Sequence, residues 1–106
     1  MFEFIELLGF SKRRNALFSE ESFKELQYEL CKNPEVGAVI SGTGGFRKLR
    51  WKISGKGKQG GLRVIYFFVP DHETIYLALA YQKNKKDDLS EQEKSTLFDI
   101  TRLLGE

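Results

Sequence analysis

Residues 42–66, GTGGFRKLRWKISGKGKQGGLRVIY, contain the patterns that decide the fold. From Arg47 to Ile53, hydrophobic and basic residues alternate with the period of two that is typical of a strand with one covered face. The glycine-rich residues 54–61 then predict a hairpin loop, and residues 62–69 are apolar apart from one arginine, which predicts a central strand covered on both faces. The hydrophobic set is Leu49, Trp51 and Ile53, and the basic set is Lys48, Arg50 and Lys52.

The flanking residues extend this hairpin into a small α+β domain. A turn at residues 70–73 and the apolar residues 74–82 add a third strand to an antiparallel meander, and Phe2 and Phe4 alternate with glutamates as in a further strand. Helix-start signals at Ser19 and Ser90 predict two helices, and the first of them ends before Pro34. We therefore expect a small twisted antiparallel sheet of three to four strands, with two helices packed on one side and a basic concave face exposed.

Charge is distributed unevenly along the chain. The formal net charge is only +2, but no Asp or Glu lies between Glu35 and Asp71, so the middle of the chain is strongly basic. A concentrated positive field on a small domain indicates a polyanionic partner, and nucleic acid is the commonest one. The seven cations of this stretch are Arg47, Lys48, Arg50, Lys52, Lys56, Lys58 and Arg63.

Composition excludes several other classes. The 106 residues suit one domain, 1–106, and the single cysteine, Cys31, rules out an internal disulfide and a zinc site built on thiolates. The opening MFEFIELLGF is too short and too acidic for a signal peptide, and no apolar run approaches the ~20 residues of a membrane span. We expect a cytoplasmic protein without a membrane segment.

The glycine-rich segment Gly42–Gly45 has two interpretations. It looks like a phosphate-cradling loop, but it lacks the spacing and the following Lys-Ser/Thr of a P-loop, and it leads into a strand instead of a helix. The favoured interpretation is a tight turn that needs positive φ angles, within a loop that covers residues 37–45.

The basic middle permits three functions at this point. Its cations could simply solvate an exposed sheet edge, bind RNA or DNA passively, or cleave RNA without a metal. Solvation fits Arg63 poorly, because an unpaired charge inside an apolar strand is costly unless a cleft or an anion receives it. Metal-dependent hydrolysis needs clustered Asp, Glu or His, and the basic stretch contains none, so we expect no metal and no cofactor.

Metal-free cleavage would proceed by attack of an RNA 2′-hydroxyl on the adjacent phosphate. The reaction needs a base, a cation on the phosphorane oxygens and a proton for the leaving 5′-oxygen. Arg63 suits the phosphorane because its planar fork matches phosphate oxygens, and Lys56 or Lys58 could transfer a proton if neighbouring cations depress its pKa. Tyr81 and Lys83, at the end of the last strand, would add a stacking ring and another cation.

Four segments between residues 33 and 90 resemble the HigB-like branch of the RelE/ParE toxin superfamily. The resemblance implies a small α+β toxin of a type II toxin–antitoxin pair that enters the ribosomal A site and cuts bound mRNA without metal. The segments are residues 33–50 (NPEVG and ISGTGGFRKLR), 55–66 (GKGKQGGLRVIY), 76–84 (YLALAYQKN) and 88–90 (DLS).

The same resemblance implies partners and site residues. The partners would be the ribosome, its mRNA and a cognate antitoxin with a helix-turn-helix, which would connect the toxin to operator DNA only indirectly. Lys56, Lys58 and Arg63 match the family's phosphate-binding and acid/base cations, and Tyr81 and Lys83 fall among its further active-site positions. The chain lacks the family's C-terminal tyrosine, and ParE-like members inhibit DNA gyrase without cleaving RNA, so a non-catalytic toxin and a passive nucleic-acid-binding module stay open. The expected RNA- and ribosome-binding residues are Arg47, Lys48, Arg50 and Lys52.

Overall fold

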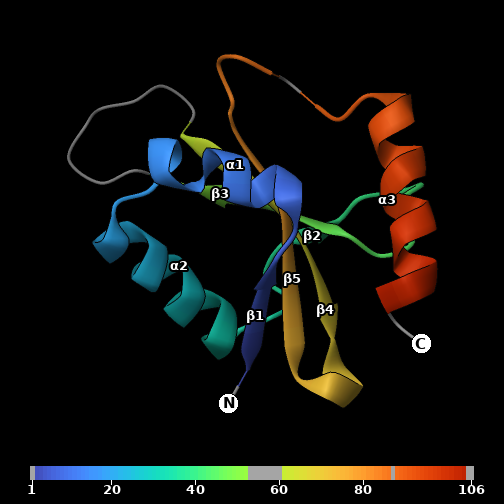
Figure 1. Cartoon of the computed structure of the whole chain (residues 1–106), viewed down its shortest axis with the longest axis horizontal. Coiled ribbons are helices and arrows are strands. Elements are labelled where there is room, and N and C mark those ends of the chain that lie inside the picture. The colour runs from blue at the N-terminus through green and yellow to red at the C-terminus, as the bar shows by residue number, and fades with distance from the viewer. Residues whose placement is uncertain (1, 53–60, 87, 105–106) are drawn as a thin grey trace.

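The computed structural model describes residues 2–52, 61–86 and 88–104, which form one mixed sheet and three α-helices (Figure 1). The five strands are arranged in the order β1-β5-β4-β3-β2. In chain order they are β1 (Glu3–Glu6), β2 (Ala38–Val39), β3 (Arg47–Trp51), β4 (Leu62–Val69) and β5 (Thr74–Gln82). The helices are α1 (Leu8–Leu17), α2 (Glu20–Lys32) and α3 (Glu91–Leu104).

Strand β4 lies at the centre of the sheet, as its sequence predicts. It pairs antiparallel with β3 on one side and with β5 on the other. Leu62, Val64 and Tyr66 are fully buried on one face, and Ile65 is fully buried on the other. The predicted alternation is confirmed within β3, because Leu49 and Trp51 pack against the first of these clusters while Arg50 is exposed. Ile53, the last residue of the predicted hydrophobic set, lies outside the described residues.

The helices cover both faces of the sheet, so the prediction of two helices on one side is wrong. Helices α1 and α2 contribute apolar side chains to the core on one face, and α3 contributes Leu97 to the core on the other. Figure 1 shows α2 and α3 on opposite sides of the strands. The physical reason lies in β4 and β5, because strands that are apolar on both faces need a cover over each face.

The predicted count of elements is also wrong, since the described residues form a five-stranded sheet and three α-helices. Helix α1 includes the polar segment Lys12–Asn15. Only Phe10 and Leu17 are buried in this helix, and its first turn has no capping side chain. Strand β2 is only two residues long within the predicted loop. The sheet is mixed instead of antiparallel, because β1 runs parallel to β5.

Capping signals set both predicted helix starts. The Ser19 hydroxyl accepts a bond from the Ser22 N–H, and Ser22 accepts one from the Ser19 N–H in return. At α3, the Ser90 hydroxyl accepts from the Glu93 N–H, and the Glu93 carboxylate accepts from the Ser90 N–H. These reciprocal bonds satisfy main-chain donors that a helix start leaves free, so both predicted caps are confirmed. No helix in the described part of the chain is long and apolar enough to cross a bilayer.

Candidate nucleic-acid interface

Three strands bring a row of polar side chains together on the α3 face of the sheet. Arg50 of β3 lies opposite Arg63 of β4, and Arg63 lies opposite Tyr81 of β5. Residues paired across strands point to the same face, with neighbouring Cβ atoms about 4.5–5.5 Å apart. The sheet thus places the Cβ atoms of two arginines and a tyrosine side by side, from residues as much as 31 positions apart in the sequence.

Further predicted residues extend this row in both directions. Lys48 precedes Arg50 on the same face of β3. Lys52 follows the end of the strand and lines a groove together with residues of α2. The Lys83 N–H donates to the Gly61 carbonyl, so Lys83 lies just beyond Tyr81 at the same end of the sheet. We name Lys48, Arg50, Arg63, Tyr81 and Lys83 the basic face. Lys56 and Lys58 lie outside the described residues.

Arg63 is the buried member of the basic face. Only 7% of its surface is exposed, and its Nη1 donates to the Leu62 carbonyl at 3.2 Å. A guanidinium keeps its charge when buried, so the sheet holds a fixed positive charge beside the exposed Arg50. This arrangement suits an anion that approaches from the exposed side of the row.

Tyr81 is buried as well, with 6% of its surface exposed, and its hydroxyl has no hydrogen-bond partner among the described residues. Its pKa is raised, chiefly because burial disfavours the phenolate and also because Asp88 lies nearby, while Arg63 acts in the opposite direction. Leu89 belongs to the same core cluster, and Lys86 Nζ lies 5.8 Å from the ring centroid. The ring therefore presents no open face for stacking in this conformation.

Two carboxylates that sequence analysis missed lie beside these cations. Asp88 Oδ1 is 3.6 Å from Lys48 Nζ, and the Leu89 N–H together with Lys48 lowers the pKa of Asp88. Burial acts to raise the pKa of Glu93, but its bonds with Lys86 Nζ, at 2.6 and 2.7 Å, and with the Ser90 N–H lower it overall. The capping signal was the available clue, because it places Glu93 at the start of a helix. It does not show which strand that helix covers, so the carboxylate could not be assigned to the site.

Arg47 is separated from the other predicted binding residues. As an odd-numbered residue of β3 it belongs to the α2 face, and its Nη1 donates to the carbonyls of Glu35 (3.0 Å) and Gly37 (2.7 Å). Tyr66 supports the same connection, because its hydroxyl accepts from the Gly37 N–H and donates to the Pro34 carbonyl. These contacts give Arg47 a structural role in holding the chain beside β3.

The Gly42–Gly45 segment forms a tight turn with positive φ angles, which confirms the favoured interpretation. The φ angles of Gly42, Gly44 and Gly45 are +82°, +79° and +124°. The Thr43 hydroxyl closes the turn by donating to the Ile40 carbonyl and accepting from the Phe46 N–H. A Cβ at Gly44 would lie 2.5 Å from Thr101 Oγ1, so the turn needs glycine there to approach α3.

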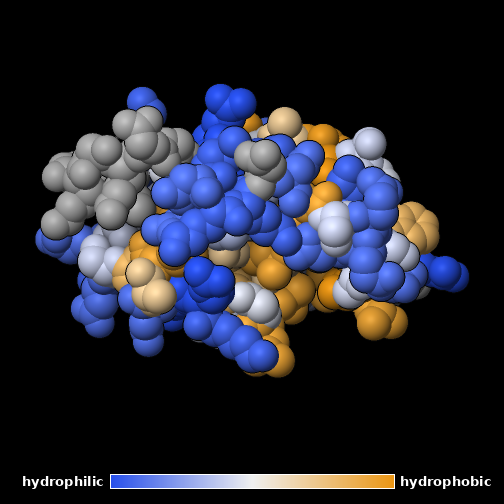
Figure 2. Space-filling view, turned by 90° about the horizontal axis from the view of Figure 1, so that it is seen from above, coloured by the Kyte–Doolittle hydropathy of each residue, from blue (hydrophilic) through white to orange (hydrophobic). Residues whose placement is uncertain are grey.

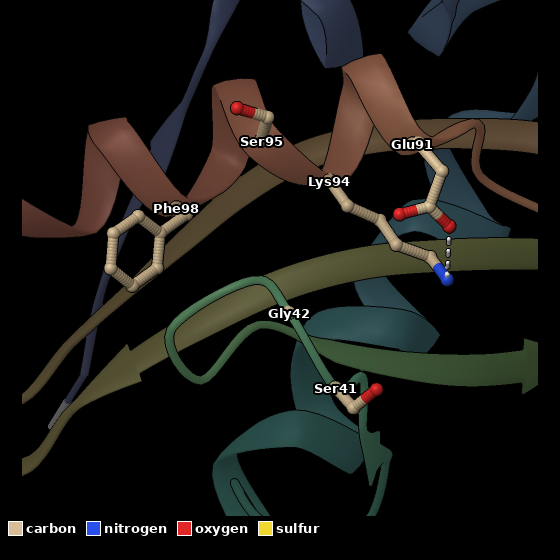
Figure 3. Close-up of a pocket in the computed structure, with 6 residues that line it drawn as sticks. All are labelled: Ser41, Gly42, Glu91, Lys94, Ser95 and Phe98. Atoms are coloured by element: carbon tan, nitrogen blue, oxygen red, sulfur yellow. Dashed lines mark ion pairs between the residues drawn. The ribbon is translucent and has the colours of Figure 1, made fainter.

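A cavity of about 310 Å³ lies between this turn and α3 (Figure 3). Ser41 and Gly42 line it from the turn, and Glu91, Lys94 and Phe98 are among the lining residues of the helix. Lys94 Nζ lies 3.6 Å from Glu91 Oε2, an ion pair that the close-up also shows. This cation is already paired with a carboxylate, so the cavity adds no second phosphate site to the basic face.

The surface of the molecule that lies at the top of Figure 1 is largely hydrophilic. Viewed from above, polar residues cover most of the centre, with hydrophobic surface exposed between and around them (Figure 2). Within residues 2–52, 61–86 and 88–104, no group of three or more His, Cys, Asp or Glu side chains could hold a metal ion. The arginine and lysine side chains of the basic face can bind anions and stabilise negative charge.

Solved structures with a similar backbone fold identify the architecture of this chain. The isolated E. coli RelE toxin aligns over 94% of this chain and 99% of its own, with a TM-score of 0.57 and 16% identity. The chain has the RelE toxin fold. A doubly substituted E. coli RelE in the free state aligns over 96% of this chain and 97% of its own (TM-score 0.60, 14% identity). A chain of the intact E. coli RelBE toxin–antitoxin complex aligns over 77% and 96% (TM-score 0.58, 16% identity). No protein-family model matches the sequence.

Proposed function

We propose that this chain is the toxin of a type II toxin–antitoxin pair and cleaves mRNA in the ribosomal A site without a metal. The observation that carries the proposal is the row Arg50–Arg63–Tyr81, flanked by lysines, on a RelE-like sheet. The sequence resemblance to the HigB-like branch supports the same activity. A cognate antitoxin is the proposed partner that keeps the toxin inactive, as the RelE structure solved with an antitoxin suggests.

The proposed reaction is an internal transfer at one phosphate. The 2′-oxygen loses its proton to a base and bonds to phosphorus, and the bond to the 5′-oxygen breaks as that oxygen gains a proton. The products are a 2′,3′-cyclic phosphate and a free 5′-hydroxyl, so this step consumes no water. In this proposal it also uses no metal. Negative charge increases on the non-bridging oxygens during this step, and fixed cations stabilise it most where they need no reorganisation.

Arg63 is the proposed phosphorane-stabilising residue, because its charge is permanent and its position is fixed by burial. Lys56 or Lys58 is the proposed proton-transfer residue, by sequence resemblance alone. Lys83 and Tyr81 are proposed to position the nucleotide; the buried Tyr81 would act through Arg63 opposite it. Lys48, Arg50 and Lys52 would hold the phosphate backbone.

The test is single-turnover cleavage of mRNA in a programmed ribosome, with ribosome affinity measured alongside. Arg63→Ala should slow cleavage by roughly two to three orders of magnitude, as removal of other oriented donors does. Arg63→Lys should restore it only in part, because the bidentate fork is lost. Lys48→Ala is the control, and it should weaken binding and lower its salt dependence with little effect on the cleavage step.

Each competing function has its own outcome. Equal losses of cleavage rate for Lys48→Ala and Arg63→Ala would mean that the basic face only binds RNA. Cleavage by Arg63→Ala at the wild-type rate would mean that Arg63 takes no part in the mechanism. In cells, mapping of mRNA 5′ ends should show cuts in phase with codons. Intact mRNA with gyrase-type DNA damage would instead indicate a ParE-like toxin.

A further inference from the structure

The outer edge of β3 is only partly occupied. Strand β2 pairs with Arg47 and Lys48 alone. The Ile40 N–H donates to the Phe46 carbonyl, and since main-chain direction alternates along a strand, even-numbered residues of β3 direct their N–H and C=O groups towards β2. Arg50 is the next residue in that series, and no strand in the described part of the chain pairs with it on this side. Among the described residues, the edge of β3 at Arg50 is therefore not covered by another strand.

A groove of about 570 Å³ runs beside this open edge on the α2 face. Leu49, Arg50 and Trp51 line it from β3, and Lys52 lines it just beyond the strand. Glu29 and Lys32 line it from α2, and Val36, 47% exposed, lines it from the segment that follows α2. Trp51 Nε1 is buried and has no hydrogen-bond partner among the described residues. An edge strand beside an apolar groove is the surface on which proteins bind extended peptides by strand addition.

We propose that this edge binds an extended segment of a protein partner, which pairs with β3 through Arg50 and whose side chains alternate between apolar and acidic. The alternation follows from the two faces of β3. Side chains of the added strand on one face would lie over Leu49 and Trp51 in the apolar groove. Those on the other face would lie beside the exposed Arg50, which pairs with Arg63, so carboxylates there complement the charge.

The open main-chain groups favour a peptide over a nucleic acid at this edge. A strand satisfies both the N–H and the C=O of Arg50 while it fills the apolar groove, whereas a phosphate backbone offers acceptors only. The acidic side chains of the added strand would meet the same cations that are proposed to hold RNA, so the two ligands should compete. That competition rests on the proposed function, but the docking does not, since it needs no catalysis.

Peptides of defined pattern test the proposal, with Trp51 as the reporter because it is the only tryptophan of the chain. The probe is a blocked eight-residue peptide that alternates valine and glutamate, and its control has the same composition with the valines and glutamates in two blocks. We expect saturable binding of the alternating peptide by calorimetry, a change in Trp51 emission, and affinity at least about tenfold above the control, or about 1.4 kcal/mol.

Methylated probes separate strand addition from general attraction without altering the protein. Methylating the alternate peptide nitrogens that face β3 should abolish binding, whereas methylating the other set should leave it intact, because only one edge of the added strand is bonded. Arg50→Pro should weaken binding more than Arg50→Ala, since proline lacks the N–H and is tolerated on sheet edges.

Three results would overturn the proposal. They are absence of saturable binding up to about 1 mM peptide, equal affinity for the alternating and block peptides, and equal effects of the two methylation sets. An RNA oligonucleotide of matched charge that changes Trp51 emission as strongly as the peptide would assign the edge to nucleic acid, which also overturns it. If the wild-type protein binds the peptide but does not cleave mRNA, only the proposed function is contradicted.

Discussion

Replacing Tyr66 by phenylalanine is expected to lower the free energy of unfolding by about 2 kcal/mol. Tyr66 is fully buried, and its hydroxyl accepts from the Gly37 N–H at 2.9 Å and donates to the Pro34 carbonyl at 2.8 Å. The ring stays in place, so no large cavity forms. A buried main-chain group left without a partner costs about 1–3 kcal/mol, and the Pro34 carbonyl, in the more exposed of the two bonds, can regain part of its loss from water.

The assay is urea unfolding followed by circular dichroism and Trp51 fluorescence, with the slope against urea expected to stay unchanged. The melting temperature should fall by about 8 °C for a domain of this size. Tyr28→Phe is the matched control, because Tyr28 is 63% exposed and should lose less than about 0.5 kcal/mol. If Tyr66→Phe and Tyr28→Phe unfold at the same urea concentration, the Tyr66 hydroxyl does not anchor the chain beside β3.

Three further predictions concern other contacts in the structure. Gly44→Ala should destabilise the protein by more than about 1 kcal/mol, measured by urea unfolding, because φ is +79° and the new Cβ would meet Thr101 Oγ1. Arg47→Ala should cost about 1–2 kcal/mol in the same assay, since two carbonyls of the preceding turn lose their donor. The folded pKa values of Asp88 and Glu93 are lowered, so their stabilisation is present above their ordinary values and lost as pH falls through the lowered ones. Stability should therefore fall as the pH drops below about 4, the ordinary carboxylate range, and Glu93→Gln should flatten that profile. An unchanged profile would contradict the assigned ion pair between Glu93 and Lys86.

Patterns of a few neighbouring residues were enough to predict β3, β4, β5 and the starts of α2 and α3. Alternation and capping depend on contacts within one strand or one helix turn, which the sequence spells out directly. Arg63 could be chosen as a site residue for the same reason, as the charged residue of an apolar strand. Helix α1 escaped prediction because only Phe10 and Leu17 are buried in it, and its stability comes from the sheet it packs on.

Only the tertiary structure decided which residues share the site. Strand register aligned Arg50, Arg63 and Tyr81, and it turned Arg47 to the opposite face. The same structure put Asp88 beside Lys48, which the sequence separates by 40 positions. Which elements pair, and which face each helix covers, depends on how the whole chain buries its apolar surface, so no local pattern encodes it. The sequence by itself determined the cations and the strands that carry them, and packing determined which of those cations lie together.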